Sequence, residues 1–431
     1  MPRSVPPEPT LDELLAEFES ALALGNFALA AEIRSKIERR LAAEADDRAA
    51  VERRIRELSA DLDGDSEPET WRDGKRGPVA LDDPVRGGGD TRPRVRGEEM
   101  FEGDRVVPVW FGTNRLPTAS GDGFTSERND RITRGRANVF VPEAHRFGEI
   151  GTPFWRRWLR LEFRDDRLRV QDVLPREPDH FYGEIRDAIH DAARDYRRAP
   201  QALFFLHGYN VSFEGAAIRA AQLACDLSVP GATAFFSWPS RGRVIAYPAD
   251  EASIEASERA ITEFLVEFAT RCGAERVHLI AHSMGNRGLL RALQRIAGDA
   301  ETRGRVRFGQ IFLAAPDIDR DLFLDLAELY PEHSDRTTLY SSRRDLAVHL
   351  SSKFHDAPRA GYHTPYTIAP NIDTVAVPNF NVDLLGHSYF AQAEALLHDM
   401  FDLLRHGAPP NDRQRIAPLK AEGESFWQVR R

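Results

Sequence analysis

The chain has 431 residues, which is enough for two or three structural units and at least one large hydrophobic core. Its formal net charge of −10 argues against a broadly basic surface for nucleic acid. Hydrophobic residues make up 42% of the chain, without an apolar run near the length that a membrane-spanning helix requires, so we expect no membrane span. The amino terminus lacks the basic and apolar segments of a signal peptide, and the 2 cysteines do not make a disulfide framework. Together these features favour a cytoplasmic protein.

Residues 1–60 are expected to form a helical arm. Their apolar residues recur at helical spacing, with a break at Gly25-Asn26. Further along, apolar residues at 4-3-4 spacing permit coiled-coil pairing: Val51, Ile55, Leu58 and Leu62. Residues 10–60 are therefore either a solvated arm or a surface that pairs with a second copy of the chain or another protein.

Residues 61–100 have the composition of a flexible linker. They contain the sequence "RGGGD", several prolines, many charged residues and few large apolar ones. Such a segment cannot bury enough apolar surface to offset the entropy lost on ordering. We expect it to separate the arm from a domain over residues 101–410, which a C-terminal tail at 411–431 follows.

The domain alternates between apolar strands and amphipathic helices. The expected strands are 105–114, 137–145, a hairpin of 158–163 with 168–173, then 201–210, 232–239, 276–283, 308–317, 337–342 and 373–378. The expected helices are 183–196, 213–227, 250–271, 285–297, one short helix before and one helix after 337–342, and 388–405. This alternation predicts an α/β fold whose mainly parallel sheet is covered by helices on both faces. Ligand sites in such sheets lie beyond the carboxyl ends of the strands.

Ser283 is the expected nucleophile. It lies in "AHSMG", between an apolar strand and a helix, with Ala281 two residues before it and Gly285 two residues after. Small residues at these positions permit a tight strand-to-helix bend, which would lift the serine from the packing and point its hydroxyl at solvent. His282 is expected to point away from the serine because residues alternate along a strand.

A second candidate segment is "FFLHGYN", in which an apolar strand runs into His207-Gly208. Gly208 permits close approach of the backbone to a ligand. The amides of Tyr209 and Met284 would then donate to an oxyanion, the latter from the positive end of a helix. We expect His207 to order this loop rather than to act as a base.

The order serine, acid, histidine is completed by residues after the last strands. His387 lies in a loop before the final helix and is the expected base, with His355 and His363 as competitors. Asp345, just beyond strand 337–342, is the expected acid that orients it. Asp317 is the alternative acid, although it could instead cap the helix that follows it.

Seven segments resemble an uncharacterised bacterial alpha/beta-hydrolase family once catalogued as domain of unknown function 900. They are "VPVWFGTNR", "ANVFVPEAHRFGEI", "FFLHGYNVSFEGAAIRAAQL", "FFSWPSRG", "HLIAHSMGNRGLLRAL", "IFLAAPDID" and "LYSSRRDLAV". The resemblance covers about residues 104–405 and implies an alpha/beta-hydrolase fold with a serine nucleophile. It does not imply a substrate.

These observations predict a serine hydrolase that cleaves small-molecule acyl esters through an acyl-enzyme, without cofactor or metal. The interval between strands 308–317 and 337–342 is too short for a large lid. Aromatic residues in the loop before the last strand would line a modest pocket or pack against the core: Phe354, Tyr362 and Tyr366. Small to medium acyl chains are therefore expected. The alternatives are a silent scaffold that binds partners through its helical arm, and an acyltransferase or thioesterase with the same triad.

Overall fold

The computed structural model describes residues 105–142, 168–196, 199–229, 231–241, 247–342, 357–362, 365–377, 390–421 and 423–430, together with Ile33 and Lys36. The chain divides into two compact units, Met1–Glu102 and Gly103–Arg431. All the helices and strands discussed below belong to the second unit. The expected arm and linker, apart from Ile33 and Lys36, lie outside the described residues.

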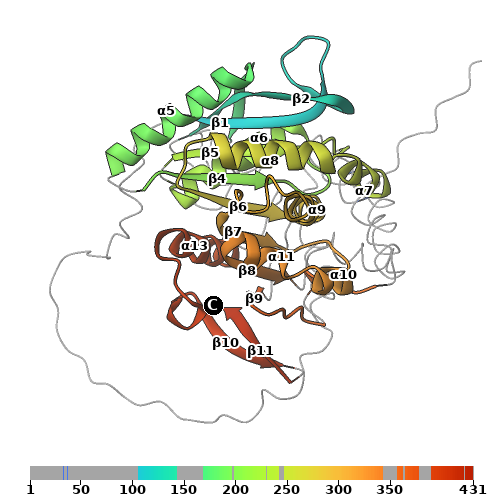
Figure 1. The fold of residues 1–431 in the computed structure, drawn as a ribbon, viewed down its shortest axis with the longest axis vertical. Helices are drawn as coiled ribbons and strands as arrows, with labels where there is room; N and C mark the ends of the chain where they lie inside the picture. Colours follow the sequence, from blue (N-terminus) through green and yellow to red (C-terminus); the bar gives the residue numbers. More distant parts are fainter. Residues whose placement is uncertain are drawn as a thin grey trace, which may run out of the picture. The chain divides into compact units, whose positions relative to one another are not determined.

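The second unit is built on an 11-stranded sheet with the order β10-β11-β9-β8-β7-β6-β4-β5-β1-β2-β3 (Figure 1). The strands are β1 (Arg105–Pro117), β2 (Phe124–Val141), β3 (Arg169–Pro175), β4 (Gln201–Leu206), β5 (Gly231–Ser237), β6 (Arg276–His282), β7 (Phe308–Ala314), β8 (Ser334–Ser342), β9 (Ile372–Val377), β10 (Ile416–Ala421) and β11 (Glu424–Val429). The strands that lie between β1 and β11 in this order, including these two, pair in parallel. Strands β2 and β3 add antiparallel pairs at one end of the sheet, and β10 adds one at the other end. The expected mainly parallel sheet is therefore confirmed.

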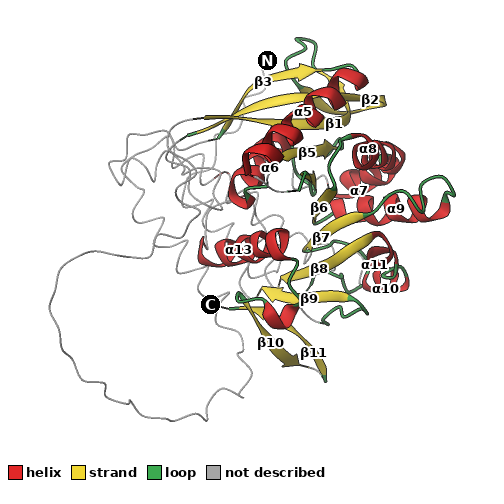
Figure 2. Ribbon diagram, turned by 60° about the vertical axis from the view of Figure 1, so that its left-hand side comes forward, coloured by secondary structure: helices red, strands yellow, loops and turns green. Residues whose placement is uncertain are grey.

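Helices cover both faces of this sheet, as the sequence predicts. They are α5 (Pro178–Tyr196), α6 (Phe213–Leu227), α7 (Tyr247–Ala256), α8 (Glu258–Arg271), α9 (Gly285–Gly298), α10 (Arg320–Asp325), α11 (Leu329–His333) and α13 (Phe390–His406). In Figure 2, α6 and α13 lie on one side of the sheet, while α8, α9, α10 and α11 lie on the other. Strand β4 shows why both faces are covered: Phe204 and Leu206 enter one core, while Leu203 and Phe205 enter the other.

The order of the strands fixes where a site can form. From β4 the chain crosses to β5 on one side, and it later returns to β6 on the other side of β4. The loops that leave β4 and β6 therefore diverge at a point where the strand order reverses. Ligands of open α/β sheets bind at such a point, beyond the carboxyl ends of the strands.

Three expectations about elements need correction or remain outside the description. The helix expected at 250–271 is two helices, since α7 ends before Ser257, whose buried hydroxyl accepts a bond of 2.9 Å from Asn114 Nδ2 and donates one of 2.7 Å to Ser253 O. The tail expected at 411–431 contains the hairpin β10–β11, which joins the sheet beside β9. The first half of the hairpin expected at 158–173 lies outside the described residues.

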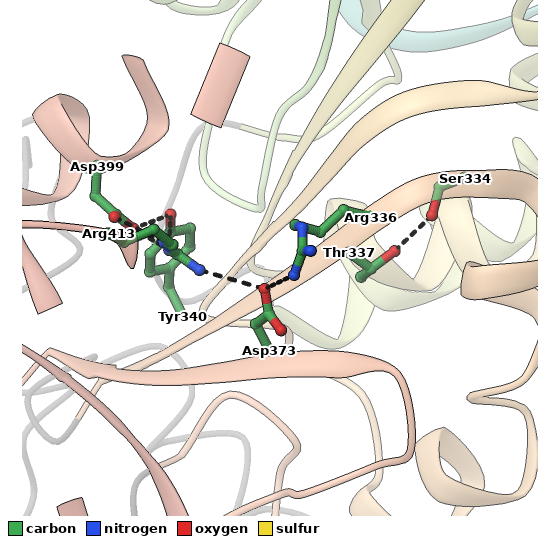
Figure 3. Close-up of polar contacts among 7 residues, drawn as sticks. All are labelled: Ser334, Arg336, Thr337, Tyr340, Asp373, Asp399 and Arg413. Atoms are coloured by element: carbon green, nitrogen blue, oxygen red, sulfur yellow. Dashed lines mark hydrogen bonds and ion pairs between the residues drawn. The ribbon is translucent and has the colours of Figure 1, made fainter. Parts of the chain in front are cut away.

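A buried arginine ties the C-terminal hairpin segment to the sheet (Figure 3). Arg413 binds Asp399 of α13, and its Nη1 lies 3.3 Å from Asp373 Oδ2 of β9. The Tyr340 hydroxyl of β8 donates to Asp399 at 2.7 Å, and Arg336 donates to Asp373 at 2.8 Å. We refer to these five residues as the Arg413 network. Its bonds join β8, β9 and α13 through side chains.

Two further features concern the surface of the fold. Among the described residues, no helix combines the length and apolarity needed to cross a bilayer. Strand β10 ends the sheet on one side, and its Pro418 and Lys420 are exposed.

Candidate active site

Ser283 follows β6 directly and has a left-handed backbone conformation, with φ of 47°. Such a conformation is uncommon for a residue other than glycine and costs about 1–3 kcal/mol, so it persists only where its surroundings enforce it. The Ser283 amide donates to Ala314 O at 2.9 Å, and the Ser283 carbonyl accepts from the Asp317 amide at 3.2 Å. The loop after β7 thus holds the bend from one side.

Gly285 shows why the residue two places after the serine must be small. A Cβ at this position would lie 2.5 Å from His207 O and 2.7 Å from Leu206 O. Only glycine permits the first turn of α9 to contact the end of β4 this closely. The bend therefore brings the loops after β4 and β6 together.

Asn286 is a part of the bend that the sequence analysis missed. Its side chain is fully buried, and its Nδ2 contacts the carbonyls of Ser283 at 3.0 Å, Ala281 at 3.1 Å and Ala314 at 3.4 Å. These acceptors lie at the bend itself and at the ends of the neighbouring strands β6 and β7. An asparagine in the first turn after the "AHSMG" segment is the only sequence signal for this role.

The loop after β4 lies directly against the serine. A Cβ on Gly208 would be 3.0 Å from Ser283 Cβ and 2.9 Å from His282 Nδ1, so glycine is needed here as well. Ser283 is only 1% exposed, and its Oγ has no hydrogen-bond partner among the described residues. The expectation of a solvent-facing hydroxyl is therefore wrong, because the loop after β4 packs against it.

The two expected amide donors flank this contact. Tyr209 follows Gly208, and its ring lies edge-on to Tyr247 with ring centroids 5.5 Å apart. Met284 precedes the first turn of α9, where amides point out of the helix, and no acceptor among the described residues is found for its amide. The structure thus brings together Ser283, Met284 and the Gly208 loop.

His207 is bound into the loop that it precedes. Its Nδ1 lies 2.7 Å from Gly208 O, its Nε2 lies 3.3 Å from Ser237 Oγ, and its ring stacks on Trp238. Burial, aided by the charge of Arg115, lowers the pKa of His207 to about 3. A neutral imidazole of such low basicity is poorly suited to take a proton from a serine near neutral pH.

His282 lies beside the serine in sequence and against Gly208 in space. Burial, aided by the nearby charge of Arg219, lowers its pKa to about 3. In the part of the chain that the structure describes, its Nε2 has no hydrogen-bond partner. Like His207, it is therefore neutral across the physiological range, and nothing in its contacts equips it as a base.

Asp317, the alternative acid, lies close to the bend, but its carboxylate is already engaged. It is fully buried; the Tyr247 hydroxyl donates to Oδ2 at 2.5 Å, while Arg287 and Arg359 approach Oδ1 at 3.4 and 3.6 Å. Burial alone would lower the pKa of Arg287, but the Asp317 carboxylate raises it overall. Asp319, not Asp317, caps α10, so the capping role considered for Asp317 is wrong.

Most of the remaining expected site residues cannot be placed. Asp345, His387 and Phe354 lie outside the described residues, as do the competing His355 and His363. Their positions relative to Ser283 therefore remain predictions.

The two expected pocket residues that can be placed both pack against the core. Tyr366 packs against Phe426 of β11 in a tilted arrangement, with ring centroids 4.0 Å apart. Tyr362 packs against the core that contains α6 and α13, beside the end of β8 at Ser342. These contacts favour the packing interpretation of both residues that the sequence left open.

A pocket of about 210 Å³ opens between α7, α9 and the loop after β7. Its lining includes Arg287, Arg359 and Glu251, but Ser283 is not among the described residues that line it. Arg287 binds Glu251, so much of the charge in this pocket is internally paired. Among the described residues, no group of acidic, histidine or cysteine side chains is arranged to hold a metal ion.

The family model for alpha/beta hydrolases of unknown function (DUF900) matches residues 187–405, which is just over half of the chain. The chain belongs to this alpha/beta-hydrolase family. The matched range of the hydrolase contains Ser283, the loop after β4 and most of the helices of both faces. The resemblance seen in the sequence is thereby confirmed.

Other comparisons give more distant likenesses to this hydrolase. An uncharacterized protein from Nostoc sp. is 26% identical in a match that covers 26% of this chain and 41% of that protein, so the chain spans less than half of that relative's length. An uncharacterized protein from Bacillus cereus is 14% identical, with 51% of this chain and 67% of that chain covered and a TM-score of 0.32. An esterase from Pyrococcus furiosus is 11% identical, with coverage of 76% and 98% and a TM-score of 0.28. At these scores neither structural likeness carries an argument.

Proposed function

We propose that this hydrolase is a serine esterase that cleaves carboxylic esters of small to medium acyl chains. The observation that carries the proposal is the left-handed Ser283 at the reversal of the strand order, in contact with Gly208. A strained bend of this kind turns one hydroxyl group out of the strand and places helix amides beside it.

Ser283 Oγ attacks the ester carbonyl and transfers its proton to His387, which Asp345 holds in one tautomer. The amides of Tyr209 and Met284 donate to the oxyanion of the tetrahedral intermediate. When this intermediate collapses, the carbon–oxygen bond to the alcohol breaks, and His387 returns the proton to the leaving oxygen. Water then attacks the acyl-enzyme by the reverse path and releases the carboxylic acid.

The proposed acyl length rests on the chain between β7 and β8. After Ala314 this interval holds only the short helices α10 and α11 before β8 begins at Ser334. A large lid does not fit there. Soluble esters should therefore be better substrates than emulsified triglycerides, and kcat/KM measured across acyl lengths should show no jump at the solubility limit.

The test of this function is covalent labelling with a fluorophosphonate, followed by hydrolysis of p-nitrophenyl esters from acetate to decanoate. Labelling that disappears in Ser283→Ala supports the proposal. Folded protein that is not labelled favours a scaffold that binds partners through residues 10–60. Labelling with faster acyl transfer to an added alcohol or thiol than to water, or a preference for thioesters, redirects the assignment to an acyltransferase or a thioesterase.

A further inference from the structure

The loop after β4 is held by side chains from three distant segments. The Asn210 amide donates to Asp250 Oδ2 at 3.1 Å, and the Val211 amide donates to Ser240 Oγ at 3.1 Å. The Val211 carbonyl accepts from Arg115 Nη2 at 2.7 Å. All three bonds reach the backbone of the two residues that directly follow Tyr209. The backbone there is fixed by groups of β1, α7 and the loop after β5.

Asp250 joins this loop to its neighbour. Its carboxylate is fully buried; Oδ2 accepts from the Asn210 amide and from Ser240 Oγ, the latter at 2.5 Å. Its other oxygen, Oδ1, accepts from the Arg241 amide at 2.7 Å. Both oxygens are required as acceptors, and an amide side chain could supply only one.

Arg115 is buried at the end of β1, yet its four acceptors among the described residues are uncharged. Its Nε donates to Ser237 Oγ at 2.9 Å, and its Nη1 to Ser240 O at 3.0 Å and Thr125 O at 3.2 Å, in addition to the bond with Val211. Burial lowers the pKa of Arg115 to about 9, an effect that the charge of Asp250 partly offsets. A planar guanidinium that donates to carbonyls of several loops fixes their relative positions, which a lysine cannot do with one ammonium.

The backbone held in this way is strained. Asn210 has φ of 57°, in the left-handed region, and lies one residue after Tyr209. Strain of this kind persists only where several contacts over-determine the conformation. The bonds from Asp250, Ser240 and Arg115 on either side of the Asn210–Val211 peptide supply that requirement.

We infer that Arg115 and Asp250 are positioning residues for the oxyanion hole. They hold Asn210 and Val211, and through them the Tyr209 amide, at a fixed distance from Ser283. The inference rests on the proposed function, since it concerns the donor of that reaction. It gives a role to the segments "FGTNR" and "SWPSRG", which the triad and the oxyanion donors do not use.

The decisive measurement separates transition-state binding from ground-state binding in Arg115→Lys and Asp250→Asn. A trifluoromethyl ketone forms a tetrahedral adduct with the serine, whose oxyanion occupies the hole, whereas the matching methyl ketone binds largely as a ground state. Misplacement of a catalytic group by about 1 Å costs about 10²-fold, so we expect kcat/KM to fall about 10- to 100-fold. The inhibition constant of the trifluoromethyl ketone should rise by the same factor, with that of the methyl ketone unchanged.

Two further sets of variants keep the result interpretable. Ser240→Ala removes one hydroxyl and leaves Arg115 and Asp250 in place, so it should show a smaller loss of the same kind even if the other variants fold poorly. Arg134→Lys and Glu267→Gln are matched controls, because Arg134 of β2 and Glu267 of α8 form an ion pair of 2.8 Å that does not touch the loop. Both controls should keep the kcat/KM of the wild type.

Three results would overturn the inference. Folded variants with wild-type kcat/KM would show that the loop does not depend on these side chains. Equal weakening of both ketones would show a general loss of site integrity rather than of the oxyanion donor. A wild-type protein with neither ester turnover nor labelling at Ser283 would remove the proposed function itself, and this inference with it.

Discussion

Arg115 and Arg413 are both buried, but their partners differ in kind. Arg413 binds the carboxylates of Asp399 and Asp373 together with the Tyr340 hydroxyl (Figure 3). Burial alone would lower its pKa, but Tyr340 and the two carboxylates raise it overall. Arg115 instead donates to backbone carbonyls and one hydroxyl, and its pKa is lowered.

The difference separates two uses of a buried charge. Where carboxylates surround the guanidinium, its charge is compensated, and the bonds join whole secondary-structure elements. Where carbonyls surround it, the burial of charge costs stability and what is gained is the fixed position of the backbone. We therefore expect changes in the Arg413 network to alter stability and changes around Arg115 to alter chemistry.

The largest expected effect tests whether the reaction takes place at Ser283, on the side of the molecule that Arg115 supports, rather than near the Arg413 network. Ser283→Ala should lower kcat by about 10⁴- to 10⁶-fold, because the covalent step is lost. Ser334→Ala is the matched control: this serine is also buried, donates to Tyr330 O at 2.8 Å and begins β8, the strand that carries Tyr340. It should keep its turnover. Ester hydrolysis that survives in Ser283→Ala would place the reaction elsewhere.

The second effect tests whether Asp317 belongs with the structural carboxylates. Its partners, a tyrosine hydroxyl and arginines, match those of Asp399. Asp345→Asn should lower kcat by about 10⁴-fold, since the histidine loses its correct tautomer. Asp317→Asn should instead lower the free energy of unfolding by about 3 kcal/mol, because Arg287 and Arg359 lose their counter-charge. Ester hydrolysis assays measure kcat, and urea denaturation measures the free energy of unfolding. A large fall in kcat for Asp317→Asn, with only a loss of stability for Asp345→Asn, would make Asp317 the acid.

Third, Arg413→Met should destabilise the domain and leave its chemistry intact. Removal of one partner from a buried ion pair costs about 3–5 kcal/mol, and Asp399 would be left uncompensated. Urea denaturation measures the loss, and kcat/KM below the unfolding transition should stay at the wild-type value. Arg413→Lys, which keeps a charge, should lose less. A fall in kcat with unchanged stability would erase the distinction between the two arginines.

Fourth, a buried histidine tests how much stability depends on the burial of a titratable side chain. Burial lowers the pKa of His278 to about 4, below the value of about 6.5 in an unfolded chain. The stability that it contributes is present above pH 6.5 and is lost as the pH falls toward 4, because only the unfolded state gains the proton. This amounts to about 1.4 kcal/mol per pH unit.

The variant for this fourth test is His278→Asn, whose side-chain oxygen can still accept the 2.9 Å bond from the Gln310 amide. Its free energy of unfolding should fall less steeply than that of the wild type between pH 6.5 and 4. Parallel curves for the two proteins would contradict the lowered pKa.

The smallest expected effect concerns residues 1–100. A chain that starts at residue 101 should keep wild-type kcat/KM, because Arg115, Asp250 and Ser283 all lie in the unit Gly103–Arg431. Light scattering should show a loss of any self-association seen in the full chain. Equal masses for the two forms would show that the arm does not assemble the protein.

Local signals in the sequence were sufficient for the fold and for the tight bend at Ser283. Apolar strands that alternate with amphipathic helices predicted the parallel sheet, and small residues on either side of Ser283 predicted the bend. These features depend on residues near one another along the chain. Asp345 and His387 remain predictions.

The support around the site could not be predicted in the same way. Arg115 and Val211 are 96 residues apart, and Asn210 and Asp250 are 40 apart, so no local pattern joins them. The break between α7 and α8 depends on Asn114 of β1. The buried hydroxyl of Ser283 follows from packing of a separate loop. Contacts of this kind appear only when the strands have been placed side by side.

The outer strand β10 has a consequence for colloidal behaviour. A strand at the end of a sheet presents unpaired amides and carbonyls, which invite pairing with another molecule and growth into aggregates. Pro418 lacks an amide hydrogen, and the exposed Lys420 brings a charge that repels a second copy of the same strand. This side of the sheet is therefore protected against the edge-to-edge pairing through which β-rich proteins precipitate.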